Sequence, residues 1–146
     1  GKQFEFPDTL KQLSPQNAEI STENFALQRA AVFTYIFGDC SSCIEKIKQW
    51  NEFFHQEAFT DLQPVMVVYT HDLTGFLWNY RSLKSINQYP IYLDREKQIQ
   101  RMNDLPKSRA YHTLLLDSTG AVLAVGNPLH NPRLEKLYKT QIQKYR

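Results

Sequence analysis

The chain has 146 residues, of which 42% are hydrophobic and 13% aromatic, enough to bury the core of one globular domain. Its 17 basic and 15 acidic residues give a formal net charge of +2 and are scattered along the sequence. This distribution lacks the concentrated basic stripe of a nucleic-acid-binding protein, so nucleic acid is not expected as a partner. The longest apolar run, residues 30–37, is far shorter than the about 20 residues that span a bilayer, so no transmembrane segment is expected.

The first 29 residues are polar and are punctuated by Pro7 and Pro15. Short apolar patches interrupt them at Phe4, Phe6, Leu10 and Leu13. Proline and polar clusters are typical of loops and edge strands. The sequence therefore predicts an N-terminal extension over residues 1–29, either an edge strand or a loop, followed by one domain over residues 30–146.

Residues Ala30–Phe37 are almost continuously apolar, which predicts a strand covered on both faces of a parallel sheet. Gly38 and Asp39 end this strand, and a helix is expected to begin near Cys40. Apolar residues then recur at three- and four-residue steps, a pattern typical of a surface helix packed on a sheet. These apolar positions are Cys43, Ile44, Ile47, Trp50, Phe54 and Ala58.

A second apolar strand, Val65–Tyr69, follows Pro64 and precedes a helix expected over residues 73–83. Asp72 lies where its carboxylate would cap this helix. The strand, helix, strand order completes a βαβ unit. The aromatic residues at helical spacing, Trp50, Trp78 and Tyr80, are expected in the core.

A short strand, Ile91–Leu93, comes next, and Asp94 is placed to cap a helix over residues 95–103. Pro106 cannot continue a helix and ends this segment. The sequence therefore inserts a strand and a helix between the βαβ unit and the C-terminal part.

The C-terminal part begins with two apolar strands, residues 113–116 and 121–125, joined by the glycine-containing turn Asp117–Gly120. This spacing predicts an antiparallel β-hairpin. A final amphipathic helix follows Pro132. Its apolar stripe consists of Leu134, Leu137, Tyr138 and Ile142.

Cys40 and Cys43, the only two cysteines, lie where the first strand gives way to the first helix. At the first turn of a helix, unpaired backbone N–H groups and the helix dipole favour thiolate over thiol. A second cysteine about one turn away can attack the first sulfur once it is in a mixed disulfide. The alternative is a static disulfide or two buried thiols, but closing so short a loop stabilises a protein little. The spacing therefore favours reversible thiol-disulfide exchange.

This order of strands, Cys-x-x-Cys helix, hairpin and terminal helix resembles the thioredoxin superfamily over roughly residues 30–146. The inserted strand and helix, the leading N-terminal segment and the Thr113–Leu116 hairpin are most similar to the TlpA/ResA branch of envelope thiol-disulfide proteins. The resemblance implies an α/β thioredoxin fold: a central mixed sheet with a parallel βαβ unit, a C-terminal antiparallel hairpin and helices on both faces. It also implies that Cys40 is the nucleophile and Cys43 the resolving thiol, and that substrates dock over the loop that contains Tyr111 and His112.

The same resemblance implies a reductant or isomerase that acts on a protein substrate with a thiol or disulfide, together with a redox partner protein. No cofactor is expected for this exchange. The resemblance places the protein in the cell envelope or periplasm, as a lipoprotein or another anchored protein. The chain begins with Gly1-Lys2 rather than methionine, as expected where a leader or anchor has been removed. The cysteine count suits an oxidising compartment and a cytosolic reductant equally.

The sequence departs from the family pattern beside the cysteines and before the hairpin. Gly38 and Asp39 replace the usual tryptophan and cysteine, and a carboxylate at Asp39 is expected to raise the pKa of Cys40. His112 stands where the family has a cis-proline, and Pro106 is too far back to take that place. Because a cis bond before a non-proline residue costs about 2.5 to 4 kcal/mol, a trans bond is expected here.

His112 is expected to face the sulfur of Cys40. It would fill the space left by proline, share a proton with the thiol, or complete a soft-metal site with Cys40 and Cys43. Two thiolates and one imidazole suit copper(I) or zinc, so the alternative function is a non-catalytic thioredoxin-like binding module or metal carrier. Peroxiredoxins share the fold, but residues 34–40 lack the proline and the correctly placed hydroxyl of the peroxiredoxin motif.

Overall fold

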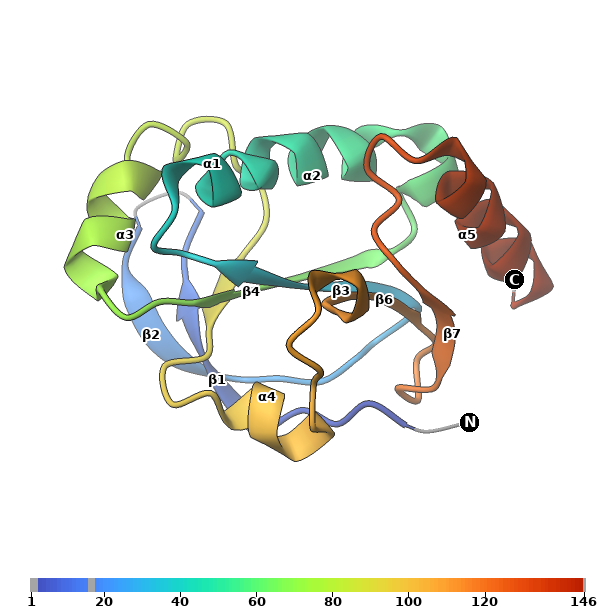
Figure 1. The fold of residues 1–146 in the computed structure, drawn as a ribbon, viewed down its shortest axis with the longest axis horizontal. Coiled ribbons are helices and arrows are strands. Elements are labelled where there is room, and N and C mark those ends of the chain that lie inside the picture. Colours follow the sequence, from blue (N-terminus) through green and yellow to red (C-terminus); the bar gives the residue numbers. More distant parts are fainter. Residues whose placement is uncertain (1–2, 16–17, 146) are drawn as a thin grey trace.

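The computed structural model describes residues 3–15 and 18–145. It forms a seven-stranded mixed sheet flanked by helices (Figure 1). The strands are β1 (Thr9–Leu13), β2 (Ile20–Asn24), β3 (Ala31–Phe37), β4 (Gln63–Tyr69), β5 (Ile91–Leu93), β6 (Thr113–Leu116) and β7 (Val122–Val125). The α-helices are α1 (Ser41–Ile44), α2 (Lys46–His55), α3 (Leu73–Tyr80), α4 (Gln98–Asn103) and α5 (Pro132–Lys144). Two short 3₁₀ helices are η1 (Glu57–Phe59) and η2 (Arg109–Tyr111).

The strand order is β2-β1-β5-β4-β3-β6-β7. The three central strands β5, β4 and β3 are parallel, and α2 and α3 make the crossovers that parallel neighbours require. β6 pairs antiparallel with β3 and with β7. The expected βαβ unit, inserted strand and C-terminal hairpin are therefore all confirmed.

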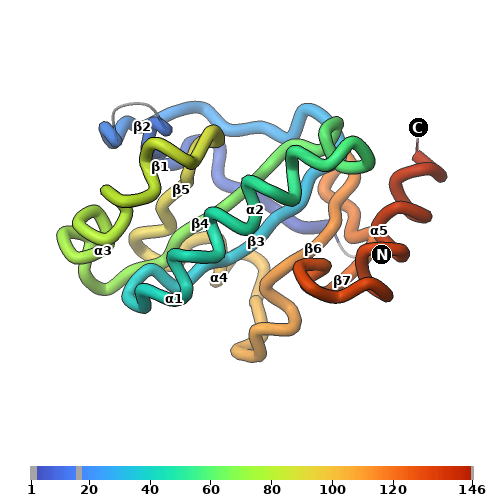
Figure 2. Tube along the Cα trace, turned by 90° about the horizontal axis from the view of Figure 1, so that it is seen from above, coloured from blue at the N-terminus to red at the C-terminus, as the bar shows by residue number. Residues whose placement is uncertain are grey.

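The central strands are buried on both faces, which explains their continuous apolar sequence. Along β3, Val32 and Ile36 enter one core, while Ala31 and Phe33 enter the other. The larger core lies under α1, α2, α3 and α5, and Figure 2 shows α2 crossing above β3 and β4. The smaller core lies on the opposite face and includes Ile99 of α4. Helices on both faces of the sheet are confirmed.

The N-terminal segment contributes two strands to one edge of the sheet. β1 and β2 form an antiparallel hairpin, and β1 also pairs antiparallel with β5, where Leu13 lies opposite Ile91. Before β1, the chain runs along the face of the sheet that carries the smaller core, where Phe4 is buried. The Phe4 amide donates to the Gly120 carbonyl oxygen at 2.7 Å. Of the two alternatives for this segment, an edge strand or a loop, its described residues include strands at the sheet edge.

Several predicted helix limits were wrong. The first helix is interrupted at Glu45, where the Lys48 amide donates to the Glu45 carbonyl in a tighter 3₁₀-type turn. Ala58, expected in this helix, lies beyond its end in η1. α3 ends at Tyr80 rather than at Leu83. α4 begins at Gln98 because residues 94–97 form a turn first, closed by the Lys97 amide and the Asp94 carbonyl.

Trp78 was expected in the core, but its side chain is 68% exposed on α3. The Arg81 guanidinium lies over its ring at 4.6 Å from the centroid. Trp50 and Tyr80, in contrast, are fully buried as predicted. Within residues 3–15 and 18–145, no helix combines the length and the hydrophobicity that crossing a bilayer requires.

Candidate functional site

The turn from β3 into α1 depends on Gly38. Its amide donates to the Tyr69 carbonyl oxygen at 2.7 Å. A Cβ atom at this position would lie 2.7 Å from Cγ1 of Val68 and 3.0 Å from Cδ1 of Phe76. Glycine therefore lets the chain pass close to β4 and α3, and it places Cys40 at the carboxyl end of the parallel strands, where α/β proteins tend to build their sites.

Cys40 is the N-cap residue of α1, and its sulfur accepts a hydrogen bond from the Cys43 amide at 3.3 Å. The sulfur also lies 2.8 Å from the Ser42 hydroxyl oxygen. Hydrogen bonds from the Cys43 thiol, the Ser42 hydroxyl and the Cys43 amide, in that order, lower the pKa of the Cys40 thiol to about 7. The Cys40 thiolate is therefore more available at neutral pH than that of an ordinary cysteine.

Cys43 differs from Cys40 in both exposure and acidity. Its side chain is buried, and this burial, reinforced by the hydrogen bond and charge of Cys40, raises the pKa of the Cys43 thiol. The positive charges of Arg109 and Lys46 oppose this shift. Both thiols are free in the structure. One reachable, acidic sulfur thus lies beside one buried sulfur that holds its proton.

Asp39 does not act on Cys40 as expected. Its carboxylate accepts hydrogen bonds from the Thr70 hydroxyl and from the amides of His71 and Asp72, chiefly the first, and these bonds lower its pKa. The pKa of Cys40 is lowered rather than raised. Asp72 caps α3 as predicted, because its side chain accepts from the Gly75 amide at 3.0 Å.

His112 ends η2, directly before β6. Its Nε2 donates to the Pro106 carbonyl oxygen at 2.7 Å, which fixes the proton on that nitrogen because a carbonyl only accepts. The ring also packs edge-on against Tyr35, with centroids 5.8 Å apart. No peptide bond among the described residues is cis, so the bond before His112 is trans, as expected. His112 lines the same groove as Cys43.

Tyr111, the other residue expected to bind substrate, lies apart from that groove. Its side chain is 49% exposed and lines a smaller cavity of about 120 Å³ together with Phe4 and Leu114. The structure therefore brings Cys43 and His112 to one groove, with Cys40 one helical turn from Cys43 but outside the groove lining, and directs Tyr111 to a different cavity.

The proposed soft-metal site is not formed. Across the part of the chain that the structure describes, no three His, Cys, Asp or Glu side chains are grouped so that they could hold a metal ion. Cys40, Cys43 and His112 therefore do not make the three-ligand set that the metal-carrier alternative requires.

The groove beside Cys43 has a volume of about 490 Å³. Its walls come from β3, α2, η2 and the turns before α4 and β6. The sequence analysis missed its cationic and aromatic lining residues, of which Lys46, Lys97, Lys107, Arg109, Tyr35 and Tyr69 are the most prominent. Of these residues, only Lys107 and Arg109 could have been considered from the sequence, because they lie in the loop before the hairpin where substrate docking was expected.

Comparison with known proteins supports the fold. No protein-family model matches the chain, and no curated protein sequence matches it. Solved structures do match at low sequence identity. A domain of a possible thiol-disulfide isomerase from Cytophaga hutchinsonii aligns with a TM-score of 0.65 and 12% identity, over 100% of this chain and 96% of that one.

Two further structures are similar. The exposed lipoprotein thioredoxin of Streptococcus pneumoniae has a TM-score of 0.59 and 14% identity, over 88% of this chain and 97% of that one. AhpC of Enterococcus faecalis has a TM-score of 0.64 and 15% identity, over 96% of this chain and 91% of that one. At these identities the likeness concerns the fold: the chain has a thioredoxin-like fold, as the order of its elements predicted.

Proposed function

We propose that this thioredoxin-like chain is a thiol-disulfide oxidoreductase that exchanges disulfides with protein substrates. The observation that supports the proposal is the pair of unlike thiols: Cys40 is reachable and has a pKa of about 7, whereas the pKa of the buried Cys43 is raised. A reactive sulfur and a protonated reserve sulfur one turn apart are the two parts that exchange requires. Similar folds in solved thiol-disulfide proteins add support at the level of fold.

The exchange proceeds in two steps. The Cys40 thiolate attacks one sulfur of a substrate disulfide, the other substrate sulfur leaves as a thiolate, and a mixed disulfide forms. Cys43 then loses its proton and attacks the Cys40 sulfur, which releases the second substrate thiol and leaves a Cys40–Cys43 disulfide. The positive charges of Lys46 and Arg109 favour the Cys43 thiolate in this step. A redox partner protein restores the dithiol by the reverse exchange.

We assign His112 to substrate positioning rather than to proton transfer with Cys40. Among the described residues no hydrogen bond joins the His112 ring to the sulfur of Cys40 or Cys43; its Nε2 donates to the Pro106 carbonyl, and its ring forms part of the groove wall beside Cys43. The proposal also keeps the location inferred from the sequence resemblance, the cell envelope or periplasm.

The test is covalent capture. A Cys43→Ser variant lacks the resolving thiol, so incubation with a protein or peptide disulfide at neutral pH should leave a stable adduct on Cys40, identified by mass spectrometry of the digested protein. A Cys40→Ser variant, which retains Cys43, is the matched control and should form no adduct.

A folded Cys43→Ser variant that forms no adduct would contradict the proposal and favour a non-catalytic binding module. Peroxide consumption by the reduced wild-type chain, without reaction with disulfides, would instead indicate a peroxidase. A Cys43→Ala variant repeats the capture if the serine substitution unfolds the chain.

A further inference from the structure

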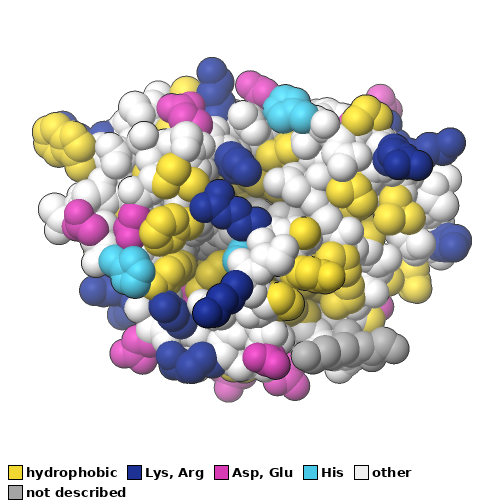
Figure 3. All heavy atoms as spheres, viewed as in Figure 1, with side chains coloured by type: hydrophobic (Ala, Val, Ile, Leu, Met, Phe, Trp, Pro, Cys, Tyr) yellow, Lys and Arg dark blue, Asp and Glu magenta, His cyan; other side chains and the backbone are white. Residues whose placement is uncertain are grey.

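Positively charged side chains converge on the groove beside Cys43. They come from segments far apart in the sequence: the start of α2, the turn before α4, and the loop before β6. These residues are Lys46, Lys97, Lys107 and Arg109. Figure 3 shows Lys and Arg side chains gathered around a central hollow on this face of the molecule.

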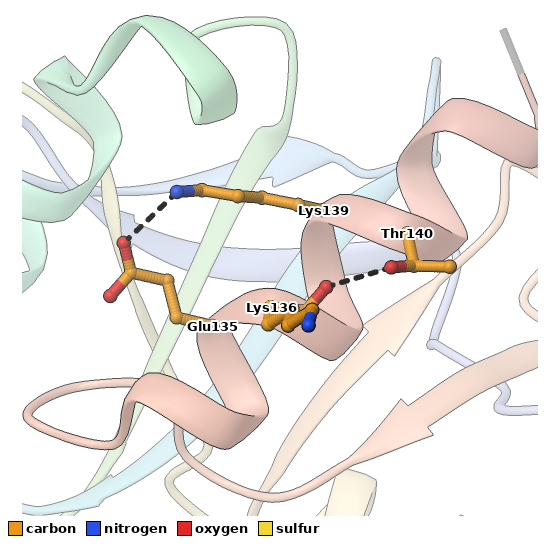
Figure 4. Close-up of polar contacts among 4 residues, drawn as sticks. All are labelled: Glu135, Lys136, Lys139 and Thr140. Carbon is orange, nitrogen blue, oxygen red and sulfur yellow. Dashed lines mark hydrogen bonds and ion pairs between the residues drawn. The ribbon is translucent and has the colours of Figure 1, made fainter.

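The lining of the groove, within the described part of the chain, has no acidic side chain, neither Asp nor Glu, beside these positive charges. An ion pair joins Glu135 and Lys139 along α5, at 3.6 Å, and neither residue lines the groove (Figure 4). The Asp94 carboxylate accepts from the Tyr35 hydroxyl and the Asp39 carboxylate accepts from the Thr70 hydroxyl, and neither carboxylate belongs to the groove lining. The described groove lining therefore carries four cationic side chains and no carboxylate.

The remaining lining of the groove is aromatic. Tyr35 and Tyr69 stack with their ring centroids 6.3 Å apart, and the Lys97 ammonium lies over the Tyr69 ring at 4.7 Å from its centroid. His112 and Phe37 extend this aromatic lining. A volume of about 490 Å³ is of the size that holds a short peptide segment or a small molecule.

We infer that this groove binds acidic residues next to the reactive cysteine of a protein substrate, and so selects thiols or disulfides in acidic peptide segments. The inference rests on the proposed function: Cys43 lines the groove and lies one helical turn from Cys40, so a substrate joined to Cys40 would lie beside this groove. Carboxylates of the substrate meet the Lys and Arg side chains, while the apolar parts of its side chains pack on the tyrosines.

Two synthetic peptides test the charge preference. Each contains a single cysteine activated as a mixed disulfide with neutral thiopyridine; in one peptide the cysteine is flanked by Glu, and in the other by Gln at the same positions. The Cys40 thiolate attacks the peptide sulfur and thiopyridone leaves, so its release reports the first step in the Cys43→Ser variant. We expect the Glu peptide to react at least about 10-fold faster at low ionic strength, with the advantage shrinking as salt is added.

A charge-removal variant locates the effect. Lys97→Gln, Lys107→Gln and Arg109→Gln together should reduce the ratio of the Glu-peptide to the Gln-peptide rate to less than about 2-fold. Since these side chains are exposed, the variant is expected to fold, and a Lys107→Gln single variant gives a smaller change in the same direction.

A matched control removes the same charges elsewhere. Arg133→Gln, Lys136→Gln and Lys144→Gln lie on α5, outside the groove lining, and should leave the ratio unchanged. Equal rates for the two peptides, or an equal loss of the ratio in the control, would overturn the inference while leaving the proposed exchange intact. Failure of both peptides to react would overturn the proposed function itself, and the inference with it.

Discussion

Ser42, between the two cysteines, contributes to the acidity of Cys40 in a way that the helix start alone does not. The hydrogen bonds from the Cys43 and Ser42 side chains lower the pKa of Cys40 more than the backbone amide of Cys43 does. α1 has only four residues, so local hydrogen bonds rather than a long helix dipole account for the reactive thiolate.

The first prediction concerns pH. Only the thiolate reacts with iodoacetamide, and a lowered pKa means that Cys40 gains its charge at lower pH than an ordinary thiol. The alkylation rate of Cys40 should therefore rise with pH, reach half its maximum near pH 7 and level off above it. Peptide mapping by mass spectrometry follows Cys40 and Cys43 separately, and Cys43 should react only at higher pH. A Cys40 midpoint at about 8.5, the value of a free cysteine, would contradict the assignment.

The second prediction isolates the Ser42 hydroxyl. Ser42→Ala removes a hydrogen bond to the Cys40 sulfur and should raise the midpoint of the alkylation profile by up to about one pH unit. Ser41→Ala is the matched control: Ser41 is also exposed in α1, but its hydroxyl is not among the groups that shift Cys40. Equal midpoints for the two variants would show that the hydroxyl contributes nothing.

At the scale of single residues, the sequence predicts features that depend on residues close together in the chain. Cys40 and Cys43 are three residues apart, so one helical turn sufficed to bring them together. The orientation of Asp39 was missed because its hydrogen-bond partners, residues 70–72, follow the end of the neighbouring strand β4. The cationic groove was missed for the same reason, since Lys46 and Lys97 become neighbours only once the sheet has formed.

At the scale of elements, the approach of the first helix to the sheet is controlled at Gly38. The third prediction is that Gly38→Ala destabilises the fold by about 1–3 kcal/mol, because the new Cβ would lie 2.7 Å from Cγ1 of Val68. Urea denaturation measures this loss.

A double-mutant cycle tests the cause of that loss. If the contact with Val68 is responsible, Gly38→Ala combined with Val68→Ala should cost less than the sum of the two single substitutions. Strict additivity would place the strain elsewhere.

Asp94 joins three elements. It is almost fully buried at the end of β5, accepts from the Tyr35 hydroxyl of β3 at 2.8 Å, and accepts from the Ile99 and Gln100 amides of α4. Two carboxylate oxygens satisfy these donors together. The link holds Tyr35, part of the groove wall, against the start of α4.

The fourth prediction follows from this geometry. Asp94→Asn turns one acceptor into an NH₂ donor that faces other donors, so the free energy of unfolding should fall by about 1–3 kcal/mol. Asp104→Asn, at the exposed other end of α4, is the matched control and should change stability by less than about 0.5 kcal/mol, since asparagine tolerates the left-handed backbone found there. Thermal unfolding of both variants gives the comparison, and equal losses would contradict the role given to Asp94.

Element types were predictable where the residue pattern itself repeats, as in β3, the hairpin and α5. Helix ends were not, because they depend on turns. The sequence marks Asp94 as a cap, but the chain makes a full turn to Lys97, in the left-handed conformation, before α4 starts. Trp78 has helical spacing on α3, yet that face of the helix meets solvent.

At the scale of the whole molecule, the order of elements was sufficient to predict the thioredoxin-like fold. The N-terminal segment was the uncertain part, since its apolar residues are too few to show a period. In the structure these residues reach both cores: Leu13 packs in the larger one, whereas Phe4 and Leu10 pack in the smaller one. The segment thus forms one edge of the sheet and covers part of the face that carries the smaller core.

The last prediction tests whether residues 1–29 are integral to the fold. Leu13 is fully buried and lies opposite Ile91 in the sheet, so Leu13→Ala should leave a cavity and lower the free energy of unfolding by about 2–5 kcal/mol. Thr9→Ala, at an exposed position of the same strand, is the control and should cost less than about 0.5 kcal/mol. Urea denaturation should remain a single transition in both variants, because β1 unfolds together with the sheet that it borders. An unchanged midpoint for Leu13→Ala would instead mean that the segment detaches before the domain unfolds, and that residues 30–146 carry the stability alone.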